Sequence, residues 1–404
     1  MKGLRPIIWP AFLGVIGCVG SLMIYKYAGF WMDVFYNITH YEGFLNISPR
    51  AHSIILPMGI SFYAVQGISG VVDKWRNAKK GEILETTNWL EYFSYMTFFP
   101  QLVAGPIVRP GELVPQLRNL PRMSNGDEVA KGLVIFTVGL AKKVLLADNI
   151  AFIVNAAYDS PAMPGFWDTL FSCYGECMQI YFDFSAYSDM AIGLGLLFGF
   201  KLPYNFLSPY RGTSLPEFWR RNHITFSFWF RDYMYIPLGG SRVGFIRRNL
   251  NLLIVWAVGG LWHGASWTFM LWGLYQGVFL MLHRSWVYVR KRFNIKPINK
   301  YVAILMLFHF QSFGIILFRA SSFQRAVDMY KGFFNFGKGI HLIQGMSIVA
   351  WSAFFLSMFI MFFFKNIHER EIKPTAAWAL ATGLLLALSI SGALVSSPFI
   401  YFQF

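Results

Sequence analysis

Residues 251–282 read NLLIVWAVGGLWHGASWTFMLWGLYQGVFLML and contain no Asp, Glu, Lys or Arg. The run is long enough to lie in a bilayer, where a helix needs about 20 mainly apolar residues. It holds one ionisable residue, His263, and such side chains are costly at membrane depth. A neutral imidazole is cheaper to bury than a charge, and it accepts a proton near neutral pH. Gly260, Gly264 and Ala265 predict close approach of another backbone or a narrow ligand. The run predicts a membrane protein with His263 as a functional residue.

The composition supports the same class. Of 404 residues, 55% are hydrophobic and only 14% are charged, which is too few charges for the surface of a soluble protein of this length. The net charge is +15, and the basic residues cluster between apolar segments, as cytoplasmic loops do. Segment 284–300 is the most basic and is predicted to be cytoplasmic. No stretch resembles a nucleic-acid module, so we expect no nucleic-acid partner.

The chain reads as an all-α polytopic protein with about nine to eleven membrane-embedded helices. We expect one membrane domain over 1–404, with a working core at 95–285 and packing helices at 301–404. Segments 165–182 and 184–201 form either one long helix or a bent pair. The candidate spans are 7–27, 53–72, 88–106, 132–156, 165–182, 184–201, 250–262, 265–283, 301–318, 345–364 and 376–395.

A polar and aromatic cluster, EFWRRNHITFSFWFRDY, occupies residues 217–233. It lacks a clean helical stripe, which favours an interfacial helix or a re-entrant segment. Arg220 and Arg221 are candidates to hold a phosphate-bearing donor, and the segment then positions His223. An ordinary interfacial helix, with its arginines on lipid headgroups, remains open.

Two further segments interrupt the apolar pattern. Asp183 and Asp189 are six residues apart, so a regular helix does not place them on one face. Asp183 is a candidate to orient a histidine or an arginine, and the alternative is that each acid pairs with a neighbouring helix. Segment 98–110 holds Pro100, Pro106 and Pro110, which predict a broken segment at a substrate entry or a simple loop.

The three cysteines are too few for a disulfide framework. Cys173 and Cys177 lie one helical turn apart, with no further ligand nearby to complete a metal site. We expect both to be small buried apolar residues, and we expect no metal.

Six blocks in order resemble the membrane-bound O-acyltransferase family, and more narrowly its alginate O-acetylation branch. They are LPMGISFYAVQGISGVVDKWR (56–76), FFPQLVAGPIVRP (98–110), QIYFDFSAYSDMAIGLGLLFGFKLPYNF (179–206), FWRRNHITFSFWFRDYMYIPLGGSR (218–242), GGLWHGASWTFMLWGLYQG (259–277) and SSPFIYFQF (396–404). The resemblance covers roughly residues 20 to 404, and the shared order of the blocks makes it specific.

The resemblance implies a multi-helix fold with re-entrant segments and a central tunnel or funnel. It implies that His263 is the catalytic residue and that His223 matches a second family histidine. Asn222 departs from the aromatic residue that more often precedes this second histidine. Relatives are also expected to carry further helices at their beginning. Besides the two histidines, the candidate substrate- and donor-binding residues are Trp262, Trp219, Arg220, Arg221, Asn222, Asp183, Gln179 and Tyr187.

The function implied is transfer of an acyl group, acetyl above all, from a cytoplasmic thioester such as acetyl-CoA. The acceptor is a polysaccharide of the cell envelope, reached directly or through a partner transferase outside the membrane. The protein is then expected in the inner (cytoplasmic) membrane, in contact with lipid and with no bound cofactor. Two alternatives remain: D-alanyl transfer, as in the teichoic-acid branch, and a transporter that is no enzyme, which the lack of an internal repeat disfavours.

Overall fold

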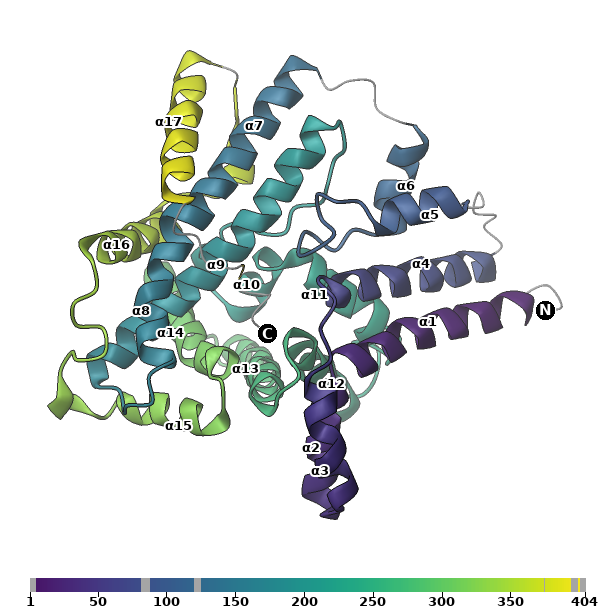
Figure 1. The fold of residues 1–404 in the computed structure, drawn as a ribbon, viewed down its shortest axis with the longest axis horizontal. Coiled ribbons are helices and arrows are strands. Elements are labelled where there is room, and N and C mark those ends of the chain that lie inside the picture. The colour runs from purple at the N-terminus through teal and green to yellow at the C-terminus, as the bar shows by residue number, and fades with distance from the viewer. Residues whose placement is uncertain (1–4, 81–87, 120–124, 374, 394–398, 400–404) are drawn as a thin grey trace. The chain divides into compact units, whose positions relative to one another are not determined.

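The computed structural model describes residues 5–80, 88–119, 125–373, 375–393 and 399. These residues form helices joined by turns, with no strand among them (Figure 1). The chain divides into two compact units, one of residues 1–124 with 198–203 and one of residues 125–197 with 204–404. The prediction of a single domain over 1–404 is therefore left as a prediction.

The first unit contains two helix pairs and a proline-rich segment. α1 (Arg5–Tyr25) lies along α4 (Ile60–Lys80), and α2 (Ala28–Thr39) pairs with α3 (Glu42–His52) (Figure 1). α5 (Trp89–Met96) begins at a capping box on Asn88 and ends at the turns of residues 97–109, after which α6 (Pro110–Arg118) starts. Residues 97–109 contain no helix, which confirms the predicted break and reflects the missing N–H groups of the prolines.

The second unit is built on two long antiparallel neighbours. α9 (Phe166–Leu197) is one unbroken helix, which decides between the two sequence interpretations of 165–201. It lies beside α7 (Gly126–Ala141), which continues through a π-helical turn, Lys142–Ala147, into α8 (Asp148–Tyr158) (Figure 1). Glycines permit the close crossing, because a Cβ on Gly193 would lie 2.7 Å from the carbonyl oxygen of Gly132.

Ion pairs join the π-helical turn to α9. Lys142 Nζ lies 2.6 Å from Asp189, and Lys143 Nζ lies 2.9 Å from Asp183 and 2.7 Å from Asp148. All three carboxylates are buried. Buried charges are tolerated in a folded protein when they are paired with an opposite charge. The sequence alternative, in which each acid pairs with a neighbouring helix, is therefore the one observed.

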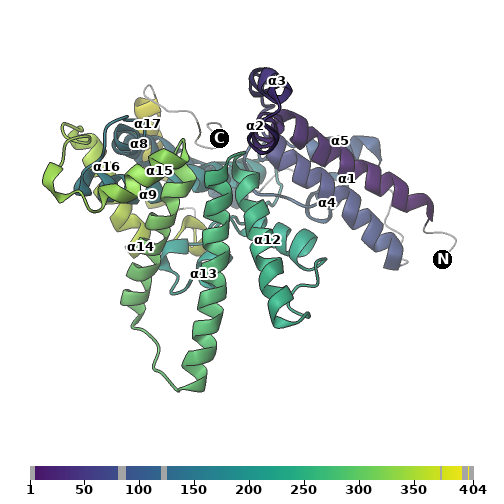
Figure 2. The ribbon, with the colours of Figure 1, turned by 90° about the horizontal axis from the view of Figure 1, so that it is seen from below.

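A hairpin of long helices carries the predicted functional histidine. α12 (Phe245–His263) returns through residues 264–266 into α13 (Trp267–Arg292), and α14 (Lys300–Arg319) runs beside α13 (Figure 2). A Cβ on Gly260 would overlap the carbonyl oxygen of Phe269, and one on Gly273 would overlap that of Trp256. The close backbone approach predicted at Gly260 is confirmed.

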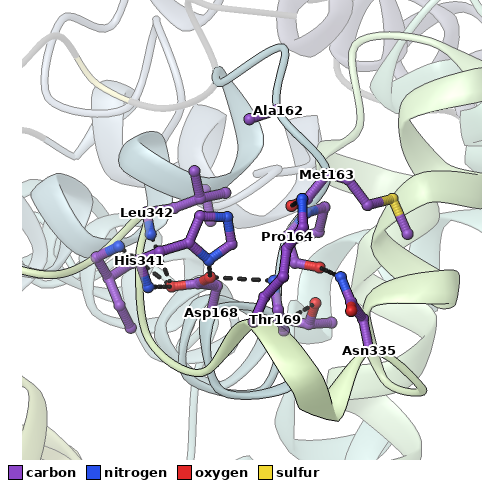
Figure 3. Close-up of polar contacts among 12 residues, drawn as sticks. Ala162, Met163, Pro164, Asp168, Thr169, Asn335, His341 and Leu342 are labelled. Atoms are coloured by element: carbon purple, nitrogen blue, oxygen red, sulfur yellow. Dashed lines mark hydrogen bonds and ion pairs between the residues drawn. The ribbon is translucent and has the colours of Figure 1, made fainter.

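The chain after α14 is tied back to the start of α9. Asp168, fully buried, accepts hydrogen bonds from the backbone N–H groups of His341, Leu342 and Ile343 at 3.0–3.2 Å (Figure 3). Its other oxygen lies 2.6 Å from His341 Nδ1. This latch fixes the loop between α15 (Phe323–Gly332) and α16 (Ile348–Phe363), and α17 (Ala376–Gly392) then packs on α7.

Two described helical stretches, Lys300–Arg319 and Ile348–Glu369, are long and apolar enough to cross a membrane unaided. The bent pair Trp9–Tyr25 and Ala28–Thr39, with an angle of 71°, passes the same test jointly. The remaining described helices are shorter, less apolar or more charged. The count of nine to eleven embedded helices stays a prediction.

Candidate active site

His223 lies at a break between two short helices. α10 (Leu215–Arg221) ends just before it and α11 (Ile224–Phe230) begins just after it. Its backbone is left-handed, with φ 44° and ψ 54°, a region that His adopts more readily than most residues with a Cβ. Residues 205–207 stabilise this break through two backbone hydrogen bonds. Leu207 N–H donates to Arg221 O at 2.8 Å, and Ile224 N–H donates to Asn205 O at 3.0 Å. Segment 217–233 therefore contains two short helices and not one, and whether it is interfacial or re-entrant stays a prediction.

His263 is the last residue of α12 and is 4% exposed. Aromatic rings surround it: those of Trp272 and Phe318 each lie 5.3 Å away between centroids, and that of Trp262 lies 5.0 Å away. The ring of His223 lies 6.2 Å from that of His263. Two histidines separated by 40 positions in the sequence thus face one small region of the second unit.

Both histidines line a cavity of about 50 Å³. This volume suffices for a small group of one or two carbons or for ordered water. The other lining residues are Cys177, Ile180, Tyr181, Phe184, Phe206, Tyr210, Phe218, Trp219, Asn222, Trp272, Gln311, Ile315 and Phe318. Cys177 is buried as expected. The last three residues belong to α14, so the cavity extends beyond the core expected at 95–285.

A buried chain of hydrogen bonds borders the cavity. Trp219 Nε1–H donates to Gln276 at 3.2 Å, and the Gln276 amide donates to Gln311 at 3.0 Å. Gln276 is fully buried and Gln311 is 6% exposed. The sequence analysis missed both glutamines, although each stands as a polar residue inside an apolar span.

Asn205 was also missed, although it lies in one of the blocks that carry the family resemblance, one residue before its end. Its side-chain oxygen lies 3.2 Å from His223 Nδ1 and accepts from the backbone N–H and the hydroxyl of Thr225. It is fully buried. Asn205 therefore belongs to the surroundings of His223.

The two predicted arginines have different environments. Arg221 pairs with Glu217 at 3.1 Å and lies 3.7 Å from Glu369. Partial burial raises the pKa of Glu217, but hydrogen bonds from Thr213 and the Arg221 pair outweigh it and hold that pKa below its ordinary value. Arg220 is exposed and lies within electrostatic range of His283. Arg220 is thus the more accessible of the two cations.

Trp262 and the two arginines are not among the residues that line the cavity, and three further predicted residues also lie outside its lining. Asp183 pairs with Lys143, a lysine rather than a histidine or arginine. Gln179 is buried on α9, and the Tyr187 ring packs 5.0 Å from that of Phe399. Apart from Phe399, the C-terminal block lies outside the described residues. A role for these three side chains in binding stays a prediction.

A larger groove, of about 950 Å³, lies between α13 and α14. Its walls are mostly apolar, and its polar lining includes His283, Arg290 and Lys300. Three helices, α10, α13 and α14, each contribute residues to both the groove and the histidine cavity. For example, α10 contributes Leu215 to the groove and Trp219 to the cavity. On α14, Lys300 and Gln311 are about 16 Å apart at 1.5 Å per residue. Within the described ranges, no three His, Cys, Asp or Glu side chains are grouped to hold a metal ion.

The helical fold and the paired buried histidines beside a small aromatic cavity define a membrane enzyme with groups suited to proton transfer. The pattern of the membrane-bound O-acyltransferase family matches residues 46–320, and the chain belongs to this family. It is an acyltransferase, and the expected all-α polytopic membrane fold is confirmed.

Curated relatives extend over most of the chain. A peptidoglycan O-acetyltransferase of Helicobacter pylori is 34% identical over 94% of this chain and 72% of its own length. A probable alginate O-acetylase of Azotobacter vinelandii is 38% identical over 80% of this chain and 62% of its own length. A teichoic acid D-alanyltransferase of Bacillus subtilis is 27% identical over 67% of this chain and 71% of its own length. These matches confirm the resemblance to the alginate branch.

Proposed function

We propose that the protein transfers an acetyl group from a cytoplasmic thioester, with acetyl-CoA as donor, for O-acetylation of a cell-envelope polysaccharide. The observation that carries this proposal is the burial of His263 and His223 around one cavity. The names of the relatives supply the acetyl group and the class of polymer. The protein then works in the inner membrane, where a thioester is available on one side and the polymer on the other.

His263 is the general base of the proposed reaction. It takes the proton of an acceptor hydroxyl while the hydroxyl oxygen attacks the thioester carbonyl carbon. The new C–O bond forms, the C–S bond breaks, and the thiolate leaves with the proton that His263 returns. His223 orients the acceptor or stabilises developing charge. The acetyl group passes either to the polymer directly or to a partner transferase outside the membrane.

The cavity favours acetyl over D-alanyl. Its volume of about 50 Å³ suits a two-carbon acyl group. None of its lining residues, all of them described, is an Asp or Glu that would pair with the ammonium of a D-alanyl group. Release of free thiol from acetyl-CoA by the purified protein, compared with turnover of a D-alanyl carrier protein, tests the choice.

The groove supports a route for the donor. Arg290 and Lys300 line it, and Arg220 acts electrostatically on His283 in its wall. Guanidinium and ammonium groups are suited to nucleotide phosphates. The donor would lie with its phosphates at these cations and its thioester toward His263. Arg221 is a weaker candidate because Glu217 already engages it.

His263→Ala in intact cells tests the function. We expect the acyl ester on envelope polymers to fall by about 10²–10⁴-fold, the usual contribution of a general base. His309→Ala is the matched control, because His309 is exposed on α14 and bonds Tyr174 and its own helix. Wild-type ester levels in the His263 variant, with the protein present in the membrane, would refute the proposal. Solute uptake by vesicles without thioester consumption would favour a transporter.

A further inference from the structure

The side chain of Asn205 makes four hydrogen bonds in a fully buried position. Its oxygen Oδ1 lies 3.2 Å from His223 Nδ1, 3.3 Å from the backbone nitrogen of Thr225 and 2.9 Å from the Thr225 hydroxyl. Its nitrogen Nδ2 donates to Ser188 Oγ at 3.1 Å. The amide is therefore held from both ends.

These contacts determine which end of the amide faces His223. A backbone N–H can only donate, so the atom that faces the Thr225 nitrogen must be the amide oxygen. The amide NH₂ then points to Ser188, where the hydroxyl oxygen accepts. An amide oxygen has no hydrogen to give, so the hydrogen between Asn205 and His223 must be on Nδ1 of the imidazole.

A neutral imidazole carries one N–H. With the hydrogen on Nδ1, Nε2 carries a lone pair and acts only as an acceptor. Nε2 is buried, and no polar atom of the described residues is within hydrogen-bonding distance of it. The ring lines the cavity and is packed by Phe184 at 4.6 Å and Phe226 at 4.7 Å. Nε2 is thus the nitrogen left for a substrate.

We propose that Asn205 is a positioning residue that holds His223 in the Nδ1–H tautomer, so that Nε2 offers a hydrogen-bond acceptor to the substrate. This inference rests on the proposed function and decides between the two roles of His223. A lone pair repels a developing oxyanion, so His223 does not stabilise that charge. It orients the acceptor instead, by accepting from a hydroxyl adjacent to the one that His263 deprotonates. Sugars supply such neighbouring hydroxyls.

The tautomer can be read without turnover. The full-length protein, with ¹⁵N-labelled histidine, is placed in lipid bilayers, and the His223 signals are assigned by difference against His223→Gln. We expect a protonated Nδ1 and an unprotonated Nε2 in the wild type. In Asn205→Leu we expect this preference to be lost. A wild-type His223 protonated at Nε2 would overturn the proposal, whether or not the protein transfers acetyl groups.

Kinetics separate positioning from a purely structural role. In membranes that carry the natural acceptor, thiol release is followed as a function of acetyl-CoA concentration. We expect Asn205→Leu to lower kcat by about 10–100-fold, as for other partners that orient a histidine, with KM for acetyl-CoA unchanged. Asn205→Asp keeps the acceptor oxygen and should restore most of kcat. Thr225→Val removes a different bond to the same oxygen and should stay within about twofold of wild type.

Two outcomes contradict the proposal. One is an Asn205→Asp protein that is folded but as slow as Asn205→Leu. The other is a Thr225→Val protein as slow as Asn205→Leu, because loss of any bond to Asn205 would then suffice. Absence of acetyl transfer by the wild type would instead contradict the proposed function alone, since the spectroscopic result stands independently.

Discussion

Buried polar side chains beside the cavity have little freedom to change partners. Trp219, Gln276 and Gln311 form a line of donors and acceptors with no water-exposed member. A polar group left unpaired in such a place costs more than the bond itself contributes, about 1–3 kcal/mol for each group. The line therefore holds the indole of Trp219 in one orientation at the cavity wall.

Gln276→Leu tests this at a single residue. The change leaves the Trp219 N–H and the Gln311 oxygen without their partner, so we expect destabilisation by about 2–6 kcal/mol, the sum of two such penalties. Thermal unfolding in detergent measures it as a lower melting temperature. Gln324→Leu is the control, because Gln324 is exposed on α15 and donates to Asp328 of its own helix. Equal melting temperatures for the two variants would contradict the prediction.

Single residues also show which parts of the candidate site could be predicted from the sequence. His263 was found because its neighbours in sequence are all apolar, a local signal. Asn205, Gln276 and Gln311 were missed because their partners are 18, 57 and 35 positions away. A single amide side chain in an apolar span costs free energy unless it is hydrogen-bonded, so the sequence predicts that it has a partner. Which residue is the partner depends on how distant helices pack.

Helices in the second unit approach closely where glycines face each other. At the crossing of α12 and α13, Gly273 faces Gly260, and each backbone fills the space that a Cβ on the other would need. This crossing lies near the end of α12, which carries His263. The position of His263, the proposed general base, is therefore coupled to the packing of two backbones.

Gly273→Ala tests the crossing. The new Cβ would overlap the carbonyl oxygen of Trp256, so the helices must separate. We expect a loss of about 1–3 kcal/mol of stability, typical of overpacking, and a fall in acetyl transfer. Gly383→Ala on α17 is the matched control: nothing lies within 4 Å of its added Cβ, and Ala favours a helix by about 0.5–1 kcal/mol. A Gly273 variant that melts above wild type would refute the close crossing.

At the same scale, the length of the apolar runs located most of the long helices, and proline located the break at 97–109. Neither feature could show that α9 continues through Asp183 and Asp189, because two acidic residues interrupt the apolar pattern of the span. The structure resolves this through Lys142 and Lys143, whose charges lie on the π-helical turn of the adjacent helix. The hydrogen bonds of the Asp168 latch could not be predicted from the sequence either, since their donors are backbone N–H groups (Figure 3).

At the scale of the whole second unit, the two ends of α14 differ in the charged residues around them. The turn of residues 293–299, which belongs to the basic segment 284–300, lies at its first end. At its other end, Arg319 pairs with Asp159 at 3.1 Å, beside the loop before α9. A helix of 20 residues is about 30 Å long, close to the thickness of the hydrocarbon core. The two loops therefore lie at opposite ends of one predicted span. The excess of Lys and Arg in segment 284–300 predicts that this end is cytoplasmic.

The predicted orientation would place the cations of the groove on the side of the proposed thioester donor, and cysteine labelling tests it. Asn294→Cys and Ala162→Cys are introduced separately with Cys18→Ser, because Cys173 and Cys177 are buried. Both new sites are exposed. We expect a membrane-impermeant maleimide to label Ala162→Cys in intact cells and Asn294→Cys only in inside-out vesicles. The reverse pattern would place Arg290 and Lys300 outside the cell, and donor binding in the groove would then have to be abandoned.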